Sequence, residues 1–316
     1  KTLKIETSNN SHFILQQLNP RFSSSVTDKI NRLTPHLASN GLRTFHVVTS
    51  SSGRTSEEFG GNFWRLLTFI DGVTFTKVNT IQHACEAGKF LAKFHLALDG
   101  YIDEQFESAQ SVHNIDLHYA KLNNALELNQ EHVFYSEVKG IAETLFRTIN
   151  ALPSLNPHQE KVLHGDPKIS NFLFSKDGQR AECLLDLDTV GPMSLPFELG
   201  DAFRSWCNPN GEDDSDGVFD SDLFKSAYEG YATMANEFLT RIERKDLVLA
   251  TLHIYFELAA RFLLDVFQET YFKWDDENFS SCAAHNLVRA KGQFSAGQDL
   301  LKQFYSLSTY LERNLA

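Results

Sequence analysis

The segment from His164 to Asp188 constrains the fold of this chain more than any other part of the sequence. Its residues, HGDPKISNFLFSKDGQRAECLLDLD, contain two apolar runs separated by Lys-Asp-Gly-Gln at 176–179. Asp-Gly between apolar runs predicts a β-hairpin, which returns the chain to its starting end. We therefore expect Asn171 and Asp186 to lie close together, with Asp166 beside them on the preceding loop.

This cluster of acidic and amide side chains predicts a metal site. Clustered carboxylates repel one another, and burying one without a partner is costly. Mg²⁺ resolves that cost, because it binds one or two carboxylates together with substrate phosphates. We predict Asn171 and Asp186 as ligands, with Asp186 the main one. Asp188 would share a strand face with Asp186, as a second metal contact or as an acceptor for local N–H groups.

The spacing between Asp166 and Asn171 is that of a kinase catalytic loop. In Asp-x-x-x-x-Asn, the Asp accepts the proton of the substrate hydroxyl and the Asn holds a metal ion. Asp166 is therefore predicted as the catalytic base. Lys168 would neutralise the transferring phosphoryl group, with a solvated surface lysine as the alternative. His164 is expected to be a structural hydrogen-bonding residue.

Composition narrows the class of protein. The 316 residues suit one large domain or two ordinary ones, and 26 phenylalanines support a sizeable core. The net charge of −12 argues against nucleic acid and anionic membranes as partners. No apolar run approaches the ~20 residues of a membrane span, and no signal peptide follows Lys1, so a cytoplasmic protein is expected. The four cysteines form no CxxC pair and are expected to be reduced.

Hydrophobic periodicity divides the chain at about Asp71-Gly72, between a small β-rich lobe and a large, mostly helical lobe. In the first lobe we expect a helix at 25–39 and strands at 12–18, 45–49 and 63–70. In the second we expect an apolar helical stripe over 87–98 and helices at 135–150, 221–241, 246–267 and 284–313. The predicted fold class is α+β, with domains 1–72 and 73–316.

The catalytic residues resemble a known family. His164–Asn171 followed by Leu185–Asp188 looks like the core of the aminoglycoside phosphotransferase and choline kinase superfamily, whose bilobal fold is similar to that of protein kinases. Further segments look like its N-acetylhexosamine 1-kinase branch: 13–19, 186–192 with 199–204, and 261–265 with 271–273 and 285–289. The resemblance implies ATP and Mg²⁺ as cofactors, with residues 1–72 binding the nucleotide and 73–316 carrying catalysis and substrate binding.

The resemblance also implies roles for residues outside the hairpin. Phe69, Ile70 and Asp71 would offer backbone groups to adenine, although an ordinary strand end fits the same residue types. Arg261 and Tyr271 would contact a sugar. The alternative for Arg261 is a packing role, with Asp265 at i+4 as its ion-pair partner.

Two more residues would support the catalytic loop from the segment C-terminal to the hairpin. Asp201 and Arg204 are implied in this role by the resemblance. Asp201 also precedes an apolar Ala-Phe pair at the expected start of a helix, which it would cap.

The small lobe departs from similar sequences. Those carry a Gly-rich turn before the first strand expected here, and the given sequence begins at Lys1 without it. A free-standing enzyme lacking that loop should bind ATP poorly, because its backbone N–H groups cradle phosphates. Gln16 stands in the slot of the usual lysine, as a predicted nucleotide-binding residue, and the helix at 25–39 contains no Glu. A Lys–Glu pair of the protein-kinase type is therefore not supported, and phosphate contacts would fall to the missing loop, to Lys168 and to metal.

These features together predict an ATP- and Mg²⁺-dependent small-molecule kinase. Its acceptor would be a sugar hydroxyl, for example the anomeric hydroxyl of an N-acetylhexosamine. One alternative is an aminoglycoside or choline/ethanolamine-type kinase. Another is a nucleotide-binding pseudokinase acting as an interaction module, favoured by Gln16 and the missing loop but opposed by the complete Asp166, Asn171 and Asp186 set.

Overall fold

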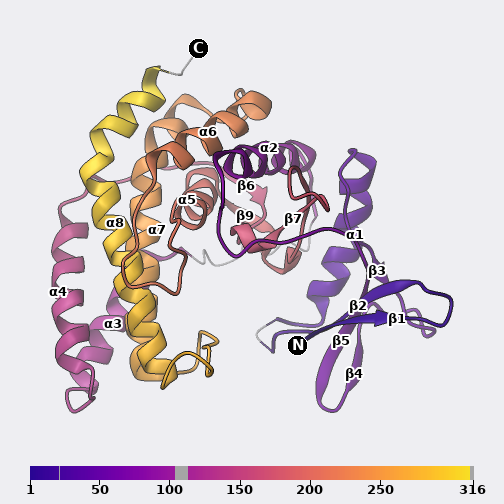
Figure 1. The fold of residues 1–316 in the computed structure, drawn as a ribbon, viewed down its shortest axis with the longest axis horizontal. Helices are drawn as coiled ribbons and strands as arrows, with labels where there is room; N and C mark the ends of the chain where they lie inside the picture. Colours follow the sequence, from indigo (N-terminus) through magenta and orange to yellow (C-terminus); the bar gives the residue numbers. More distant parts are fainter. Residues whose placement is uncertain (21, 104–112, 314–316) are drawn as a thin grey trace.

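The computed structural model describes residues 1–316 except 21, 104–112 and 314–316. A small, sheet-rich part formed by the N-terminal residues lies beside a larger and mostly helical part (Figure 1). The predicted α+β, bilobal fold class is therefore confirmed.

The small lobe is an antiparallel sheet covered by one helix. Its strand order is β1-β2-β5-β3, and β4 pairs with β5. Helix α1 buries Ile30, Leu33 and Leu37, which recur at helical spacing on one face. Strands β1 and β4 were not predicted. The bounds are β1 (Thr2–Glu6), β2 (His12–Gln17), α1 (Ser25–Ser39), β3 (Val47–Val48), β4 (Glu57–Phe59) and β5 (Asn62–Thr68).

The large lobe is built around two pairs of packed helices. Helix α2 packs mainly against α6, and α7 against α8. The first pair approaches closely at glycines: a Cβ at Gly88 would lie 2.1 Å from the Ala227 carbonyl oxygen. The sequence did not predict α3, and it placed the start of the helix that is α5 at Asp201 instead of Leu195. The bounds are α2 (Ile81–Leu98), α3 (Ile115–Leu128), α4 (Tyr135–Asn150), α5 (Leu195–Trp206), α6 (Ser221–Ala235), α7 (Arg241–Gln268) and α8 (Cys282–Arg313).

Helix α7 forms the centre of this lobe. A capping box fixes its start, because the Thr240 hydroxyl accepts from the Glu243 N–H while the Glu243 carboxylate accepts from the Thr240 N–H. The sequence suggested no membrane span, yet α7 is long and apolar enough for one. In the structure, 78% of that apolar window is buried in the protein, as in a core helix.

Two small antiparallel ribbons lie between the helices and carry the catalytic loop. One pairs β6 (Glu160–Leu163) with β9 (Gly191–Ser194). The other is the predicted hairpin, which pairs β7 (Phe172–Phe174) with β8 (Ala181–Leu184) around a turn where Gly178 has φ +72°. The hairpin is confirmed, but its second strand is shorter than predicted. Strand β8 ends at Leu184, and the short 3₁₀ turns η1 (Ile169–Asn171) and η2 (Leu187–Thr189) flank the hairpin.

Candidate active site

The loop between β6 and β7 holds Asp166 in a dense hydrogen-bond network. The Asn171 side-chain Nδ2 donates to the Asp166 carbonyl at 2.8 Å and to its carboxylate at 3.2 Å. Lys168 Nζ lies 2.6 Å from the same carboxylate. Burial would lower the Lys168 pKa, but the charge and hydrogen bond of Asp166, together with the charges of Asp186 and Glu212, outweigh it and the pKa is raised. The ammonium therefore stays charged beside the carboxylate.

The hairpin brings Asn171 and Asp186 together, as predicted. The Leu185 N–H donates to the Asn171 carbonyl at 2.8 Å, so the next residue, Asp186, leaves the sheet at the level of Asn171. Asp186 has φ +54° and ψ +61°, a left-handed conformation that is unusual for a non-glycine residue and is often found at functional sites. Partial desolvation by the surrounding residues, and then the neighbouring Asp188 and Asp166 carboxylates, raise the Asp186 pKa.

This arrangement fits a hard divalent cation. Asp186 is exposed at the surface of the site, and it lies against the Asp188 and Asp166 carboxylates, a concentration of negative charge that a cation would relieve. Asn171 uses its Nδ2 on Asp166, which leaves its Oδ1 as the atom for a metal ion. Among the described residues, no group of three His, Cys, Asp or Glu side chains suits a metal. A metal held here would therefore depend on Asp186, Asn171 and substrate phosphates.

Asp188 is placed differently from the expectation. It lies in the turn η2 rather than on a strand with Asp186, so the prediction of a shared strand face is wrong. Its carboxylate is 2.5 Å from Arg65 Nη1, and the two side chains are only 8% and 1% exposed. The alternative prediction was that Asp188 accepts from local N–H groups. Its carboxylate instead accepts a hydrogen bond from Arg65, which is distant in the sequence. Asp188 therefore joins the two lobes through a buried ion pair.

Gln16 and Lys29 complete this junction. Gln16 is the cross-strand partner of Arg65 and accepts two hydrogen bonds from its guanidinium, at 2.9 and 2.7 Å. Lys29 of α1 donates from Nζ to the carbonyls of Asp188 and Val190, both at 2.8 Å. Burial lowers the Lys29 pKa to about 8, against the raising effect of Asp188. Sequence reasoning missed both cations, although a lone arginine in the apolar strand β5 was an available signal.

Helix α5 supports the catalytic loop through residues that were not predicted. The Glu198 carboxylate accepts the backbone N–H groups of His164 and Gly165, each at 2.9 Å. Trp206 Nε1 donates to the Pro167 carbonyl at 2.9 Å. Gly165 has φ +85°, and a Cβ there would lie 2.5 Å from the Thr189 carbonyl oxygen, so the loop requires glycine.

The predicted supporting residues make other contacts. His164 Nε2 lies 2.9 Å from the Leu185 carbonyl and so links the loop to the hairpin. Asp201 lies inside α5, so the predicted capping role is wrong. It pairs with Arg204 at 2.6 Å, and Arg204 also binds Glu212 at 2.8 Å. Burial would raise the Asp201 pKa, but the charge and hydrogen bond of Arg204, together with the charges of His113 and Lys168, outweigh it and the pKa is lowered.

One cavity of about 370 Å³, called here the central cavity, connects the catalytic loop with α7 and the segment after it. Asp166, Lys168 and Asp186 line it together with Arg261 and Tyr271. Arg261 donates to the Tyr271 hydroxyl at 2.7 Å and lies 3.6 Å from Glu257. The alternative prediction, an ion pair between Arg261 and Asp265, is therefore wrong.

Asp265 instead organises the chain after α7. Its carboxylate accepts the backbone N–H groups of Thr270, Tyr271 and Phe272 at 2.8–2.9 Å. The three N–H groups therefore orient the segment that presents Tyr271 to the central cavity.

The predicted adenine-binding segment connects the two lobes. Val73 and Phe174 exchange backbone hydrogen bonds at 3.0 and 2.8 Å, which fixes this connection to the hairpin. Asp71 pairs with Lys176 at 2.5 Å on an exposed surface. Lys4 lies over the Phe69 ring at 4.1 Å. Among the described residues that line the central cavity, Gln16 and residues 69–71 do not occur.

The geometry suits transfer of a group to a hydroxyl. A carboxylate, a charged lysine and a candidate pair of metal ligands are the kinds of group that phosphoryl transfer uses for positioning and charge neutralisation. Asp166 and Lys168 both line the central cavity, where a bound group would meet them.

Comparisons with solved structures show the same fold. An aminoglycoside phosphotransferase from Alicyclobacillus acidocaldarius superposes with a TM-score of 0.63 at 13% identity, over 99% of this chain and 90% of that one. A microcompartment-associated aminopropanol kinase gives a TM-score of 0.63 at 15% identity, over 97% of this chain and 90% of that one. At such identities the similarity concerns the fold alone.

Sequence comparisons define the family. A homoserine kinase from Caulobacter sp. (strain K31) is 25% identical over 231 residues, which represent 70% of this chain and 68% of that protein. The model of a family described as "Phosphotransferase enzyme family" matches residues 1–235, more than half of the sequence. The chain belongs to this phosphotransferase family.

Proposed function

We propose that the chain transfers the γ-phosphoryl group of ATP to a hydroxyl of a small sugar, with the anomeric hydroxyl of an N-acetylhexosamine as the first acceptor to test. Family membership supplies the coarser statement, a small-molecule phosphotransferase that uses ATP and a divalent metal ion. In this proposal residues 1–72 bind the nucleotide, and residues 73–316 carry catalysis and acceptor binding.

One observation carries the proposal. Asp166, the predicted base, lines the same cavity as Arg261 and Tyr271, whose guanidinium and hydroxyl can hydrogen-bond to a sugar. The cavity volume of about 370 Å³ is in the range of sites for small molecules, about 300–1,000 Å³. A hydroxyl held between these groups would lie against the base.

The residues of this chain divide the chemistry between them. Asp166 accepts the proton of the attacking hydroxyl, and Asn171 keeps its carboxylate oriented. Lys168 places a positive charge beside Asp166, where the transferred phosphoryl group would carry negative charge. Asp186 and Asn171 would hold Mg²⁺, which supplies charge neutralisation for the phosphates. Catalysis then rests on positioning and electrostatics rather than on a covalent intermediate.

An amino-alcohol acceptor is the second candidate, supported by the acidic walls of the central cavity. Asp201, Glu212 and Glu257 line it in addition to the catalytic carboxylates. Similar proteins are named homoserine kinase and aminopropanol kinase, and both of those acceptors carry an amino group. Against a cationic acceptor, Arg204 and Arg261 partly neutralise these walls.

A panel of acceptors separates the two candidates. The purified protein is incubated with ATP and Mg²⁺ and with N-acetylglucosamine, N-acetylgalactosamine, homoserine, 1-amino-2-propanol or choline. ATP consumption is measured, the phosphorylated position is assigned by phosphorus NMR, and Asp166→Asn provides the background rate. We expect turnover with an N-acetylhexosamine and a phosphate on its anomeric oxygen. Turnover with only the amino alcohols would reject the sugar acceptor and support the amino-alcohol acceptor.

A further inference from the structure

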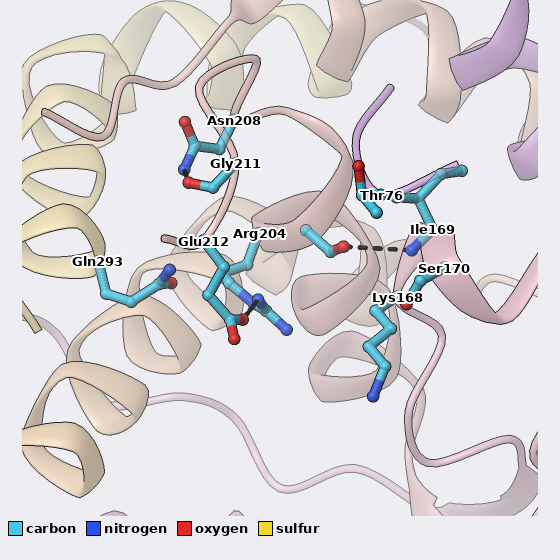
Figure 2. Close-up of a pocket in the computed structure, with 10 residues that line it drawn as sticks. Thr76, Lys168, Ile169, Ser170, Arg204, Asn208, Gly211, Glu212 and Gln293 are labelled. Atoms are coloured by element: carbon cyan, nitrogen blue, oxygen red, sulfur yellow. Dashed lines mark hydrogen bonds and ion pairs between the residues drawn. The ribbon is translucent and has the colours of Figure 1, made fainter. Parts of the chain in front are cut away.

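A second cavity adjoins the central cavity and has no role in the mechanism above. This side cavity has a volume of about 220 Å³ and shares Lys168, Arg204 and Glu212 with the central cavity. Figure 2 shows Lys168, Ile169, Ser170 and Thr76 on one side and Gln293 on the other, with Arg204 and Glu212 between them. The volume corresponds to several water molecules, at about 30 Å³ each, or to one small polar group.

Gln293 is a buried polar residue of the side cavity whose side-chain oxygen is not satisfied by the described part of the fold. It lies on α8, its side chain is 1% exposed, and its amide points into the side cavity toward Glu212 and Arg204 (Figure 2). Its Oε1 is buried without a hydrogen-bond partner among the described residues. A buried amide oxygen without a donor is unfavourable, so an O–H or N–H group in the cavity would relieve it.

The charged side chains around the side cavity are already paired with one another. Lys168 is paired with Asp166, and Arg204 with both Asp201 and Glu212. A phosphate in the side cavity would compete with Asp201 and Glu212 for Arg204, and an ammonium group would compete with Arg204 for Glu212. The remaining polar walls are neutral hydroxyls and amides, such as those of Ser170, Ser205 and Asn208. This chemistry suits a neutral group with several hydrogen-bonding atoms.

We propose that the side cavity is a second acceptor subsite, in which Gln293 binds a neutral, hydroxyl- or amide-bearing unit of the acceptor while the reacting hydroxyl lies beside Asp166. Lys168 and the Arg204–Glu212 pair line both cavities, so an acceptor reaching past them from the central cavity would occupy both. This proposal rests on the proposed function, since it assigns a further part of the same sugar acceptor. The preferred acceptor is then larger than one sugar ring.

The test compares two neutral acceptors that share a reducing end. N-acetylglucosamine fills one subsite, and its β-1,4-linked disaccharide, N,N′-diacetylchitobiose, is long enough for two. KM is measured for both acceptors and for ATP in the wild type, in Gln293→Met and in Gln298→Met. Methionine keeps the length of the side chain and removes the amide. Gln298 is the matched control, because it lies on the same helix and bonds to Thr148 at 3.2 Å instead.

One neutral hydrogen bond changes an affinity by about 3- to 10-fold, which sets the expected effect. The wild type should have the lower KM for the disaccharide, and Gln293→Met should remove that advantage. The KM values for the monosaccharide and for ATP should stay within about twofold of the wild type in both variants. The melting temperature of both variants should equal that of the wild type within the error of the assay.

Three other outcomes overturn the inference in distinguishable ways. If sugars are phosphorylated but Gln293→Met leaves the disaccharide KM unchanged, the side cavity holds only solvent and the proposed function stands. If Gln293→Met lowers the melting temperature and raises both acceptor KM values equally, Gln293 has a structural role only. If the wild type phosphorylates neither sugar, the sugar acceptor and the subsite for it are both rejected.

Discussion

Removing the Arg65 guanidinium should destabilise the protein more than most single substitutions. Arg65 and Asp188 form a 2.5 Å ion pair with side chains 1% and 8% exposed, and Gln16 accepts two further hydrogen bonds from Arg65. In Arg65→Met, Asp188 would remain buried without its counter-ion. Breaking a buried pair in this way costs about 3–5 kcal/mol. Because domains unfold with about 5–15 kcal/mol, the variant would lose a large share of its stability.

A double-mutant cycle measures whether the pair causes this loss. The free energy of unfolding is obtained from urea titrations of the wild type, Arg65→Met, Asp188→Asn and the double variant. We expect the double variant to be more stable than the sum of the single effects predicts, by about 2 kcal/mol. The exposed Lys225–Asp222 pair, at 3.2 Å with 36% and 72% exposure, is the control and should couple by about 0.5 kcal/mol or less. Additive effects at Arg65 and Asp188 would refute the reasoning.

The same variants test the second metal-ligand interpretation of Asp188. Because Arg65 already occupies its carboxylate, Asp188→Asn should leave the Mg²⁺ concentration for half-maximal activity near that of the wild type. Activity is measured well below the melting temperature of each variant. A large rise in the Mg²⁺ requirement would place Asp188 back in the metal site.

The remaining predictions concern the central cavity. Asp166→Asn should lower kcat about 100- to 10,000-fold with nucleotide affinity retained in calorimetry, and near wild-type turnover would exclude Asp166 as the base. Asp186→Ala should remove the Mg²⁺ dependence of ATP binding. In the wild type, the raised Asp186 pKa means that protons should compete with Mg²⁺ at a higher pH than at an ordinary Asp, so Mg²⁺ affinity should fall early on acidification. Arg261→Ala should raise the acceptor KM about tenfold or more and leave the ATP KM unchanged; equal losses with a lower melting temperature would indicate packing alone.

The hairpin could be predicted from sequence because its determinants are local. The Asp-Gly turn and the two apolar runs lie within the segment itself, and they place Asn171 beside Asp186 without help from the rest of the chain. Within the hairpin, the prediction of the second strand failed only after Leu184, where β8 ends. There the chain bends at Asp186, and the distant residues Arg65 and Lys29 hold the turn η2 in place. A period-two pattern carries no information about such partners.

The supporting residues of the loop could not be predicted for the same reason. Glu198 binds backbone N–H groups more than thirty residues earlier in the sequence, and a backbone group leaves no trace in residue types. Arg65 is a partial exception. A charged residue in the otherwise apolar strand β5 requires a buried partner, so the sequence could indicate that a partner exists but not that it is Asp188.

The junction between the lobes explains how this chain orders its acidic site without a Lys–Glu pair in the small lobe. In protein kinases that pair joins a strand lysine to a helix glutamate. Here the strand cation is Arg65, directly across from Gln16, and the helix α1 contributes the cation Lys29. Both cations bind Asp188, one at its carboxylate and one at its carbonyl. Asp188 lies two residues after Asp186, the main predicted metal ligand. The sheet and the helix of the small lobe therefore both help to position the turn η2, which begins directly after Asp186.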